Sequence, residues 1–326
     1  MTAVNTDDAS EPLMPGELRP QPLFYVADEK LEVTDIGLTS EHLYFSVEWQ
    51  GVYRMPKHGG AVEVVDAGAK NSFRHLSIVR DDVFWPRTRF GERDRASVEV
   101  KHRPTASGPN VLAFSGEWSM HSNHGHFQAD ASGIFFVGSS SGSVFLGLWQ
   151  VATTGGPPTS LLSFEEPWRV PGWKRDAGRI FFATPLLTVS RSTAVSVLVD
   201  GQTEPRLLAT LPAGSARLHD TDAGFLYLSD SKTVWRVGKD DGVVAEVVTG
   251  EVVRSLLVDD ARIYLAASLE TGGWLNSIDK SDGLRRRVGS GSAFRGLRQL
   301  VQDDHHIYSL HDHGHRVSVV AKAPSQ

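Results

Sequence analysis

The chain has 326 residues, a formal net charge of −6 and no cysteine. Without cysteine, the protein has no disulfides, zinc–thiolate sites, iron–sulfur clusters or cysteine nucleophiles. The mild acidity argues against a nucleic-acid partner, because such proteins need a basic patch to displace phosphate counterions. No apolar run approaches the roughly 20 residues that cross a bilayer. We therefore expect neither nucleic acid nor a membrane as a partner.

The first 21 residues contain Asp, Glu and several Pro. A secretory signal would instead begin with basic residues and continue into an apolar segment. We interpret residues 1–21 as a disordered lead-in and residues 22–326 as a single domain. The expected location is the cytoplasm.

A short pattern recurs along the domain: one or two acidic residues, a short gap, and then an aromatic residue between mostly apolar neighbours. Examples are DASGIFFVG from Asp130 and DDARIYLAA from Asp259. The aromatic residues of the seven copies are Tyr44, Phe84, Phe135, Phe181, Tyr227, Tyr264 and Tyr308. Subtracting these numbers gives spacings of 40, 51, 46, 46, 37 and 44 residues. Such spacings are typical of a β-propeller blade, which takes ~40–50 residues.

Each copy has the turn signals for four strands, because Asp-rich and Gly-containing turns separate its apolar segments. In the sixth copy the expected strands are Ser255–Val258, Ile263–Leu265, Leu275–Ile278 and Arg285–Val288. The sequence therefore predicts an all-β fold, a seven-bladed β-propeller. Six blades are the alternative if the irregular stretch between Phe84 and Phe135 is not a blade.

The seventh copy lacks an outer strand. Its three expected strands cover residues 297–302, 306–310 and 317–322, after which the sequence ends. We predict that the N-terminal segment Pro22–Val26 supplies the missing strand, so that the two ends of the domain pair and no sheet edge stays open.

The repeat resembles that of YWTD-like bacterial propeller proteins, which carry an Asp-rich turn, an aromatic second strand and an Asp-Gly turn. The Trp and Thr-Asp that follow the tyrosine in that signature are replaced here by Leu-Ala at 265–266 and Ser-Leu at 309–310. The resemblance implies the fold. It carries almost no information about activity, because such propellers serve as ligand-binding, protein-binding and enzymatic scaffolds.

Histidines gather in two segments, HSNHGH from His121 and HHIYSLHDHGH from His305. We place the first segment before the third inner strand, and His311, His313 and His315 in the loop between the second and third strands of the last blade. Those two loops would share one face of the ring. His305 and His306 belong to a turn on the opposite face.

Neutral imidazole is the commonest protein ligand of zinc, copper and nickel. Exposed loop histidines are one interpretation. The other is a single divalent metal ion bound by His126, His311 and His313, with Asp312 nearby.

Several of the expected inner strands contain polar residues. The inner strand is the most buried part of a blade, so charged side chains there need either water in the channel or polar partners. These strands contain His126, Lys174, Arg217 and His219. A polar channel mouth with a structural role is one reading. The alternative is a ligand site lined by His75, Trp118, His126 and Trp173, with Trp168 as a further wall. These tryptophans could equally pack between blades.

Two functions therefore stay open. The first is a scaffold that binds a small molecule or a protein partner on its loop face around the central channel. The alternative is a metal-assisted lyase or hydrolase, in which His219 is the general base and Lys174 or Arg217 stabilises oxyanion charge.

A long charged segment, PRTRFGERDRASVEVKHRP from Pro86, is expected to form a loop on the same face. Either it is simply solvated, or it acts as a lid or an anion-binding arm. We find no nucleotide-binding motif, and Gly-Ser runs such as Gly138-Ser139-Ser140-Ser141-Gly142 are interpreted as hairpin loops, not as phosphate loops or nucleophile elbows, because they do not precede a helix.

Overall fold

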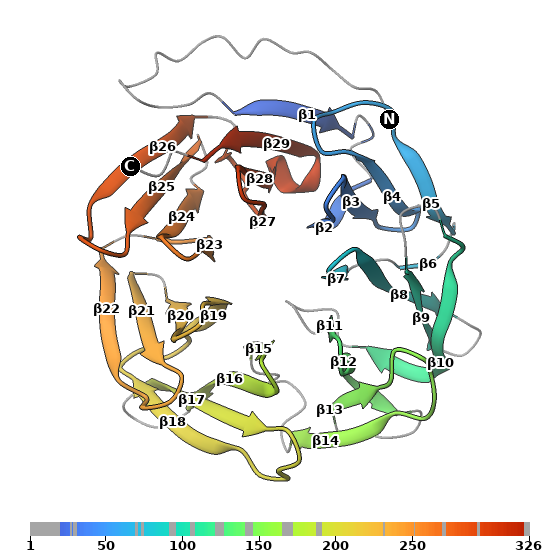
Figure 1. Ribbon diagram of the computed structural model, residues 1–326, viewed down its shortest axis with the longest axis horizontal. Coiled ribbons are helices and arrows are strands. Elements are labelled where there is room, and N and C mark those ends of the chain that lie inside the picture. Colours follow the sequence, from blue (N-terminus) through green and yellow to red (C-terminus); the bar gives the residue numbers. More distant parts are fainter. Residues whose placement is uncertain are drawn as a thin grey trace.

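The computed structural model shows a ring of β-sheets around a central axis (Figure 1). The described residues are 20–26, 28, 31–68, 71–72, 75–90, 96–104, 108–120, 127–140, 146–164, 172–186, 191–230, 232–250, 252–268, 272–291 and 294–322. Most of the predicted lead-in lies outside them. Within these ranges no helix is long and apolar enough to span a membrane.

Four blades are regular four-stranded antiparallel sheets whose strands follow chain order from the axis outward. Blade 1 contains β2 (Val33–Leu38), β3 (His42–Val47), β4 (Gly51–Pro56) and β5 (Glu63–Ala67). Blade 4 contains β15 (Gly172–Asp176), β16 (Arg179–Leu186), β17 (Ser192–Val199) and β18 (Arg206–Leu211). Blade 5 contains β19 (Arg217–Thr221), β20 (Phe225–Ser229), β21 (Thr233–Gly238) and β22 (Val244–Thr249). Blade 6 contains β23 (Ser255–Val258), β24 (Arg262–Ser268), β25 (Gly273–Asp279) and β26 (Arg285–Gly291).

Blade 7 is closed by the N-terminal strand, as predicted. It contains β27 (Gln299–Gln302), β28 (His306–His311), β29 (Arg316–Ala321) and, as its outer strand, β1 (Gln21–Tyr25). The register of this pair places Gln21 opposite Val319 and Tyr25 opposite Arg316. Figure 1 shows β1 in blue beside β29 in red, so the two ends of the ring share one sheet.

Blades 2 and 3 depart from this regular pattern. Blade 2 contains β6 (Asn71–Ser72), β7 (Ser77–Val79), β8 (Asp82–Phe90), β9 (Ala96–Arg103) and β10 (Val111–Met120). Blade 3 contains β11 (Phe127–Asp130), β12 (Gly133–Ser140), β13 (Leu146–Val151) and β14 (Thr159–Phe164). The long β10 pairs with β9 and then, through Trp118 and Met120, with β12. The two blades thereby form one continuous nine-stranded sheet.

The irregular stretch between Phe84 and Phe135 is therefore a true blade, and the prediction of seven blades is confirmed. The expected charged loop from Pro86 is wrong in large part. Strand β8 continues to Phe90 and β9 begins at Ala96, because alternating residues such as Val98 and Val100 are fully buried and select a strand.

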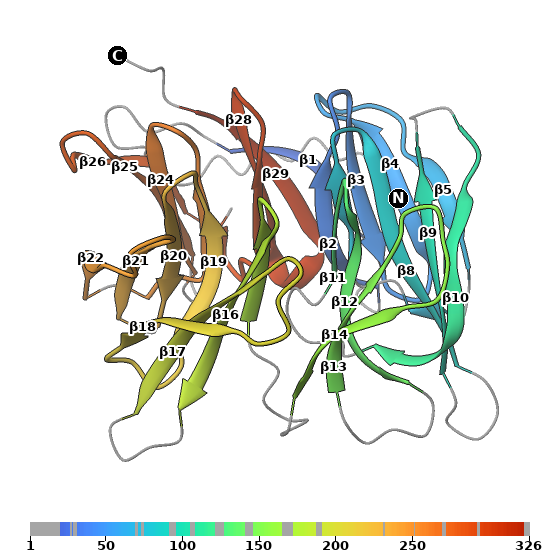
Figure 2. The same ribbon diagram turned by 60° about the horizontal axis from the view of Figure 1, so that its bottom comes forward.

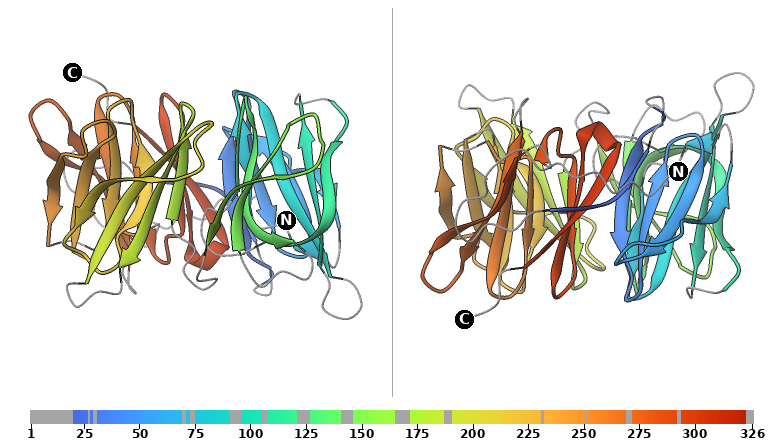
Figure 3. Two further views of the ribbon diagram at one scale, coloured as in Figure 1. Left: turned by 90° about the horizontal axis from the view of Figure 1, so that it is seen from below. Right: turned by 90° about the horizontal axis from the view of Figure 1, so that it is seen from above.

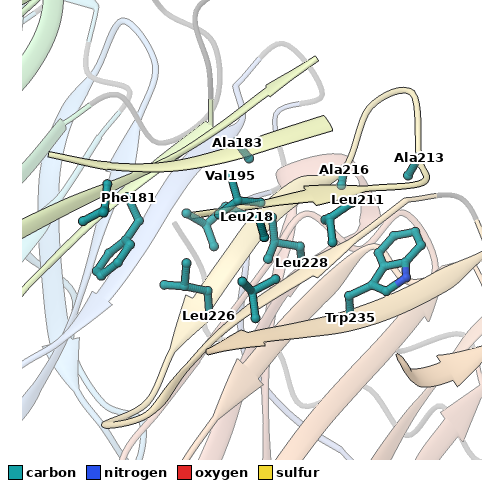
Figure 4. Close-up of a cluster of buried hydrophobic side chains, with 13 residues drawn as sticks. Phe181, Ala183, Val195, Leu211, Ala213, Ala216, Leu218, Leu226, Leu228 and Trp235 are labelled. Atoms are coloured by element: carbon teal, nitrogen blue, oxygen red, sulfur yellow. The ribbon is translucent and has the colours of Figure 1, made fainter. Parts of the chain in front are cut away.

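The core lies between neighbouring blades. All seven aromatic residues of the repeat are at most 2% exposed. The core between blades 4 and 5 illustrates the packing, because Phe181 and Val195 of one blade meet Leu218 and Trp235 of the other (Figure 4). The strands run between the two faces of the ring, and the turns lie on these faces (Figures 2 and 3).

A second set of contacts ties neighbouring blades together near the turn between the first and second strands. At four junctions, a lysine that follows the third strand of one blade pairs with the turn aspartate of the preceding blade. We call this pair the lysine staple. The pairs are Lys57–Asp303 (2.9 Å), Lys322–Asp259 (2.9 Å), Lys280–Asp222 (2.6 Å) and Lys239–Asp176.

Three of the staple ammonium groups also lie close to the aromatic ring of the preceding blade. The distance from Nζ to the ring centroid is 5.4 Å for Lys322 and Tyr264, and 5.7 Å for Lys280 and Tyr227. At these distances the ring attracts the cation through its quadrupole. The staple therefore joins carboxylate, ammonium and ring across the junction.

The junction between blades 3 and 4 uses a different cation for the same purpose. Asp200 follows the third strand of blade 4, where other blades carry lysine. Arg175, whose side chain is 3% exposed, binds Asp130 of blade 3 and also Asp200, at 2.7 Å. Its guanidinium carbon lies 4.0 Å from the centroid of the Phe135 ring. Carboxylate, cation and ring are thus preserved here.

Candidate functional site

Most polar residues of the inner strands have structural partners in a neighbouring blade. Side chains of one inner strand hydrogen-bond the backbone of the next, and one ion pair takes their place between blades 4 and 5. In order around the ring the contacts are Asp35 with Leu76 (2.7 Å), Ser77 with Ala129 (2.7 Å), Gln128 with Arg175 (2.8 Å), Lys174 with Asp220 (3.9 Å), Asp220 with Val258 (2.9 Å), Gln302 with Val258 (2.8 Å) and Gln299 with Ile36 (3.0 Å).

Every junction between neighbouring inner strands is therefore bridged by a polar side chain. Asp220 uses both carboxylate oxygens, since one accepts from the Val258 amide and the other faces Lys174. Gln299 both accepts from and donates to the backbone of Ile36. Such saturation is what buried polar groups require. The structural reading of the polar strands accounts for these residues.

Four inner-strand residues of blades 1, 4 and 5 form the candidate site, and two of them, Asp35 and Lys174, also bridge a junction. The four are Asp35 on β2, Lys174 on β15, and Arg217 and His219 on β19. Lys174 acts electrostatically on both Asp35 and His219, and Arg217 also acts on His219. The four side chains thus belong to one electrostatic group. We call it the axial cluster.

His219 occupies a β-bulge, which explains its position. Leu218 pairs with Leu228 and Asp220 pairs with Tyr227, so His219 is the extra residue between them. Bulges re-aim side chains in this way and are frequent beside functional sites. The His219 Nε2 atom lies 2.8 Å from the Ser229 hydroxyl. That contact fixes the orientation of the imidazole ring.

Burial, and to a smaller extent the positive charges of Arg217 and Lys174, together lower the pKa of His219 to about 3. The ring is therefore neutral at physiological pH. Its role as general base stays a prediction, but a pKa this low makes the ring a weak proton acceptor at neutral pH. As a neutral imidazole it can still donate or accept one hydrogen bond.

Asp35 is a member of the cluster that no sequence pattern singled out. Burial raises the pKa of its carboxyl to about 7, against hydrogen bonds from Leu76, Gln299 and Ile36 and the charge of Lys174, which lower it. An aspartate that titrates near neutral pH is a mark of functional sites. Only the tertiary surroundings identify it, because VTDIGL reads as an ordinary inner strand.

Arg217 differs from the other cations of the inner ring. Among the described residues it has no ion pair and no hydrogen bond through its side chain, although burial within the ring lowers its pKa. Arg217 is exposed at the start of β19. An exposed cation that has no counter-ion among the described residues is accessible to an anion from solution.

The predicted aromatic walls have other positions or lie outside the described side chains. Trp173 is 3% exposed and packs with Phe135 and Phe182 in the core between blades 3 and 4, which is the packing alternative. Trp118 lies on β10 opposite Ser140. Trp168 lies outside the described residues. His75 is half-buried just before β7.

The proposed metal ligands are only partly described. His121, His124 and His126 lie outside the described residues. His311 was expected in a loop, which is wrong: it is the last residue of β28, 2% exposed, with Nε2 2.8 Å from the Ser318 hydroxyl. Ser309 and Leu310, which precede it, are buried as well, so the buried part of the strand extends to His311. His313 is exposed in the short 3-10 turn η3 (Asp312–Gly314).

Within the parts of the chain that the structure describes, no three potential ligand residues are close enough together to hold a metal ion. The prediction for His305 and His306 is confirmed, because Asp303 and His306 flank the turn between β27 and β28, on the face away from the loops that enter the inner strands.

No family model and no curated protein matches this sequence. Solved structures with the same fold do exist. The virginiamycin B lyase of Staphylococcus aureus, solved with quinupristin, is 10% identical with a TM-score of 0.61, covering 93% of this chain and 99% of its own. The β-propeller domain of the trilobed protease from Pyrococcus furiosus is 12% identical with a TM-score of 0.59, covering 89% and 95%.

A prolyl endopeptidase is 13% identical with a TM-score of 0.62, covering 89% of this chain and 45% of its own. At such identities the likeness establishes the fold alone. The protein is a seven-bladed β-propeller. These similarities support the propeller resemblance in general and do not single out the YWTD-like repeat.

Proposed function

We propose that the protein is a binding propeller that takes a small anionic ligand at the axial cluster. The observation that carries this proposal is that the exposed Arg217 guanidinium has no ion pair or hydrogen bond with any residue in the described ranges. A carboxylate or phosphate accepts two parallel hydrogen bonds from one guanidinium, and such charge-assisted bonds are about twice as strong as neutral ones. Lys174 adds a second positive charge, which is only loosely paired with Asp220 at 3.9 Å.

The other two members of the cluster set the selectivity. His219 stays neutral and offers a hydrogen bond without adding charge. Asp35, with a pKa of about 7, opposes an anion only when it is ionised. Since its carboxyl is protonated below pH 7, anion binding should strengthen as the pH falls from 8 to 6.

Calorimetric titration with acetate, inorganic phosphate and citrate tests the proposal. We expect at least one of these anions to bind, and Arg217→Gln to weaken that binding by about tenfold, the value of one lost charge-assisted hydrogen bond. Arg206→Gln is the matched control, because Arg206 is an exposed arginine on the outer strand of the preceding blade. It should leave binding unchanged.

Asp35→Asn supplies the pH test. Acetate is the probe here because its charge is constant between pH 6 and pH 8. The amide cannot ionise, so the variant should bind acetate equally at both pH values, whereas the unmodified protein binds it more tightly at pH 6. The proposal fails if none of the three anions binds, or if Arg217→Gln and Arg206→Gln behave alike.

A further inference from the structure

A cavity of about 560 Å³ opens between blades 2 and 3, on the face opposite the loops that enter the inner strands. It lies beside the first turn of each blade, with Val79 of blade 2 on one side and Ala131 of blade 3 on the other. The turn after the third strand of blade 3, at Thr153, completes the wall. This is the place that the lysine staple fills at other junctions.

Both members of the staple are replaced here. Thr153-Thr154-Gly155-Gly156 aligns with Lys57-His58-Gly59-Gly60, so Thr153 stands where blade 1 carries its staple lysine. Val79 precedes Phe84 by five positions, as Asp303 precedes Tyr308. A short hydroxyl and an isopropyl group therefore replace an ammonium and a carboxylate, and the space stays open.

A carboxylate is still present, but it is set back across the turn. Val79 and Asp82 are register partners of β7 and β8, and such partners point to the same face of a sheet with Cβ atoms about 5 Å apart. Within the described parts of the chain, the Asp82 carboxylate has no hydrogen bond or ion pair. Its charge acts on His102, where it partly opposes the lowering of the imidazole pKa by burial.

Part of the remaining wall is apolar or carries uncharged side chains. Val111 and Leu112, the first residues of β10, are 40% and 53% exposed at the rim. His102 stacks on Phe84 with ring centroids 5.0 Å apart, and burial lowers its pKa. Its Nδ1 atom is buried without a hydrogen-bond partner among the described residues. The rim could cover a hydrocarbon stem, and the imidazole could receive or supply one hydrogen bond.

Two further charges border the cavity. Asp130 is engaged by Arg175 of blade 4, which neutralises it. Arg80, at the tip of the turn between β7 and β8, is exposed to solvent. Of the two carboxylates that line the cavity, Asp82 is therefore the one that has no partner among the described residues.

We propose that this cavity binds a small primary alkylammonium ligand, which takes the place of the absent staple lysine. The ammonium pairs with Asp82, and the alkyl stem lies along Val111 and Leu112. The four internal lysines of the same fold show that this position accepts such a group between two blades. The setback of the carboxylate leaves room for a ligand that enters from outside.

Hexylamine, hexanol and hexanoate, which share one hydrocarbon chain, test the chemical class. Binding is followed through the amide NMR signals of Thr153 and Thr154. We expect saturable shifts with hexylamine and at least tenfold weaker binding of the other two, because a charge-assisted hydrogen bond is lost. Equal binding of hexanol or hexanoate, or no saturable shift with hexylamine, would overturn the proposal.

Variants test the location. Asp82→Asn should weaken hexylamine binding about tenfold. Asp81→Asn is the matched control, because it makes the same change one residue away, on a carboxylate that binds Ser40 of blade 1. It should leave hexylamine binding unchanged.

The double variant Val79→Asp with Thr153→Lys rebuilds the staple and fills the cavity, so hexylamine should no longer shift the amide signal of Thr154. Retained hexylamine binding in this variant, or equal effects of Asp81→Asn and Asp82→Asn, would overturn the assignment of the site. Because Asp82→Asn preserves the size of the side chain, it keeps the proposal testable even if the double variant does not fold.

Discussion

The two halves of the ring hold their blades together by different means. From blade 4 round to blade 1, four junctions carry the lysine staple, with carboxylate and ammonium from adjacent blades. At the junction of blades 2 and 3 that pair is absent. There, β10 crosses from one blade to the other and pairs with both β9 and β12.

The difference shows that a junction needs a connection but not a particular one. A continuous sheet joins blades 2 and 3 through backbone hydrogen bonds, so this junction does not need a lysine staple to hold the two blades together. The 560 Å³ cavity lies where the staple would otherwise be. In a repeat protein, the interface that departs from the others is thus a place where a binding site can form at little cost in stability.

Removing a staple lysine should have the largest effect. The Lys239 side chain is 0% exposed and binds the Asp176 carboxylate and the Asp222 carbonyl. We expect Lys239→Ala to lower the free energy of unfolding by about 3 kcal/mol, because a buried partner is lost. Urea denaturation measures this. Lys232→Ala, an exposed lysine of the same blade, should change it by less than about 0.5 kcal/mol.

A loss under about 1 kcal/mol for Lys239→Ala would mean that the staple contributes little and that the two halves of the ring are held more similarly than the contacts suggest.

Acid should weaken the staple that closes the ring. Burial acts to raise the pKa of Asp303, but hydrogen bonds from Lys57, His305 and His306 outweigh it and hold the pKa at about 2. Because the pKa in the folded protein lies below the ordinary aspartate value of 3.8, the stabilisation is present above about pH 4 and is lost as the pH falls toward 2. Asp303→Asn should therefore cost about 2 kcal/mol at pH 7.

At pH 2 the Asp303→Asn variant and the unmodified protein should approach the same stability. Thermal unfolding at pH 7, 4 and 2 provides the measurement. A difference that stays constant over this range would show that the Asp303 carboxylate does not act through its charge.

Rebuilding the staple at the exceptional junction should have the smallest effect. Val79→Asp with Thr153→Lys places both charges where the other half of the ring carries them. We expect a gain of about 1 kcal/mol in the free energy of unfolding, since the site is partly exposed and the sheet already joins the blades. Thr153→Lys alone should gain less. A double variant less stable than either single variant would contradict the equivalence of the junctions.

The sequence was sufficient for the architecture because its signals are local. In five of the seven copies the aromatic residue, such as Tyr264, sits five positions after a turn aspartate, and both features lie within one hairpin. The outer strand near Phe24 was predictable as well, because the last copy was one strand short.

The axial cluster and the lysine staple were less predictable, because the contacts that define them come from residues in other blades. The staple joins residues that are far apart in the sequence, as with Lys57 and Asp303, so no single repeat reveals it. The raised pKa of Asp35 arises from burial in the assembled ring. His311 misled for the opposite reason: the polar letters around it suggested a loop, but its ring lies inside blade 7 against Ser318.

The pairing of β1 with β29 gives a chain without cysteine a reversible form of circularisation. Nearly the whole polypeptide lies between these two strands, so opening their hydrogen bonds releases the longest loop in the molecule. The entropy of that loop grows only with the logarithm of its length, so a short strand suffices to hold it closed. A ring closed in this way can open and close again when the backbone hydrogen bonds between these two strands break and re-form, without any redox chemistry.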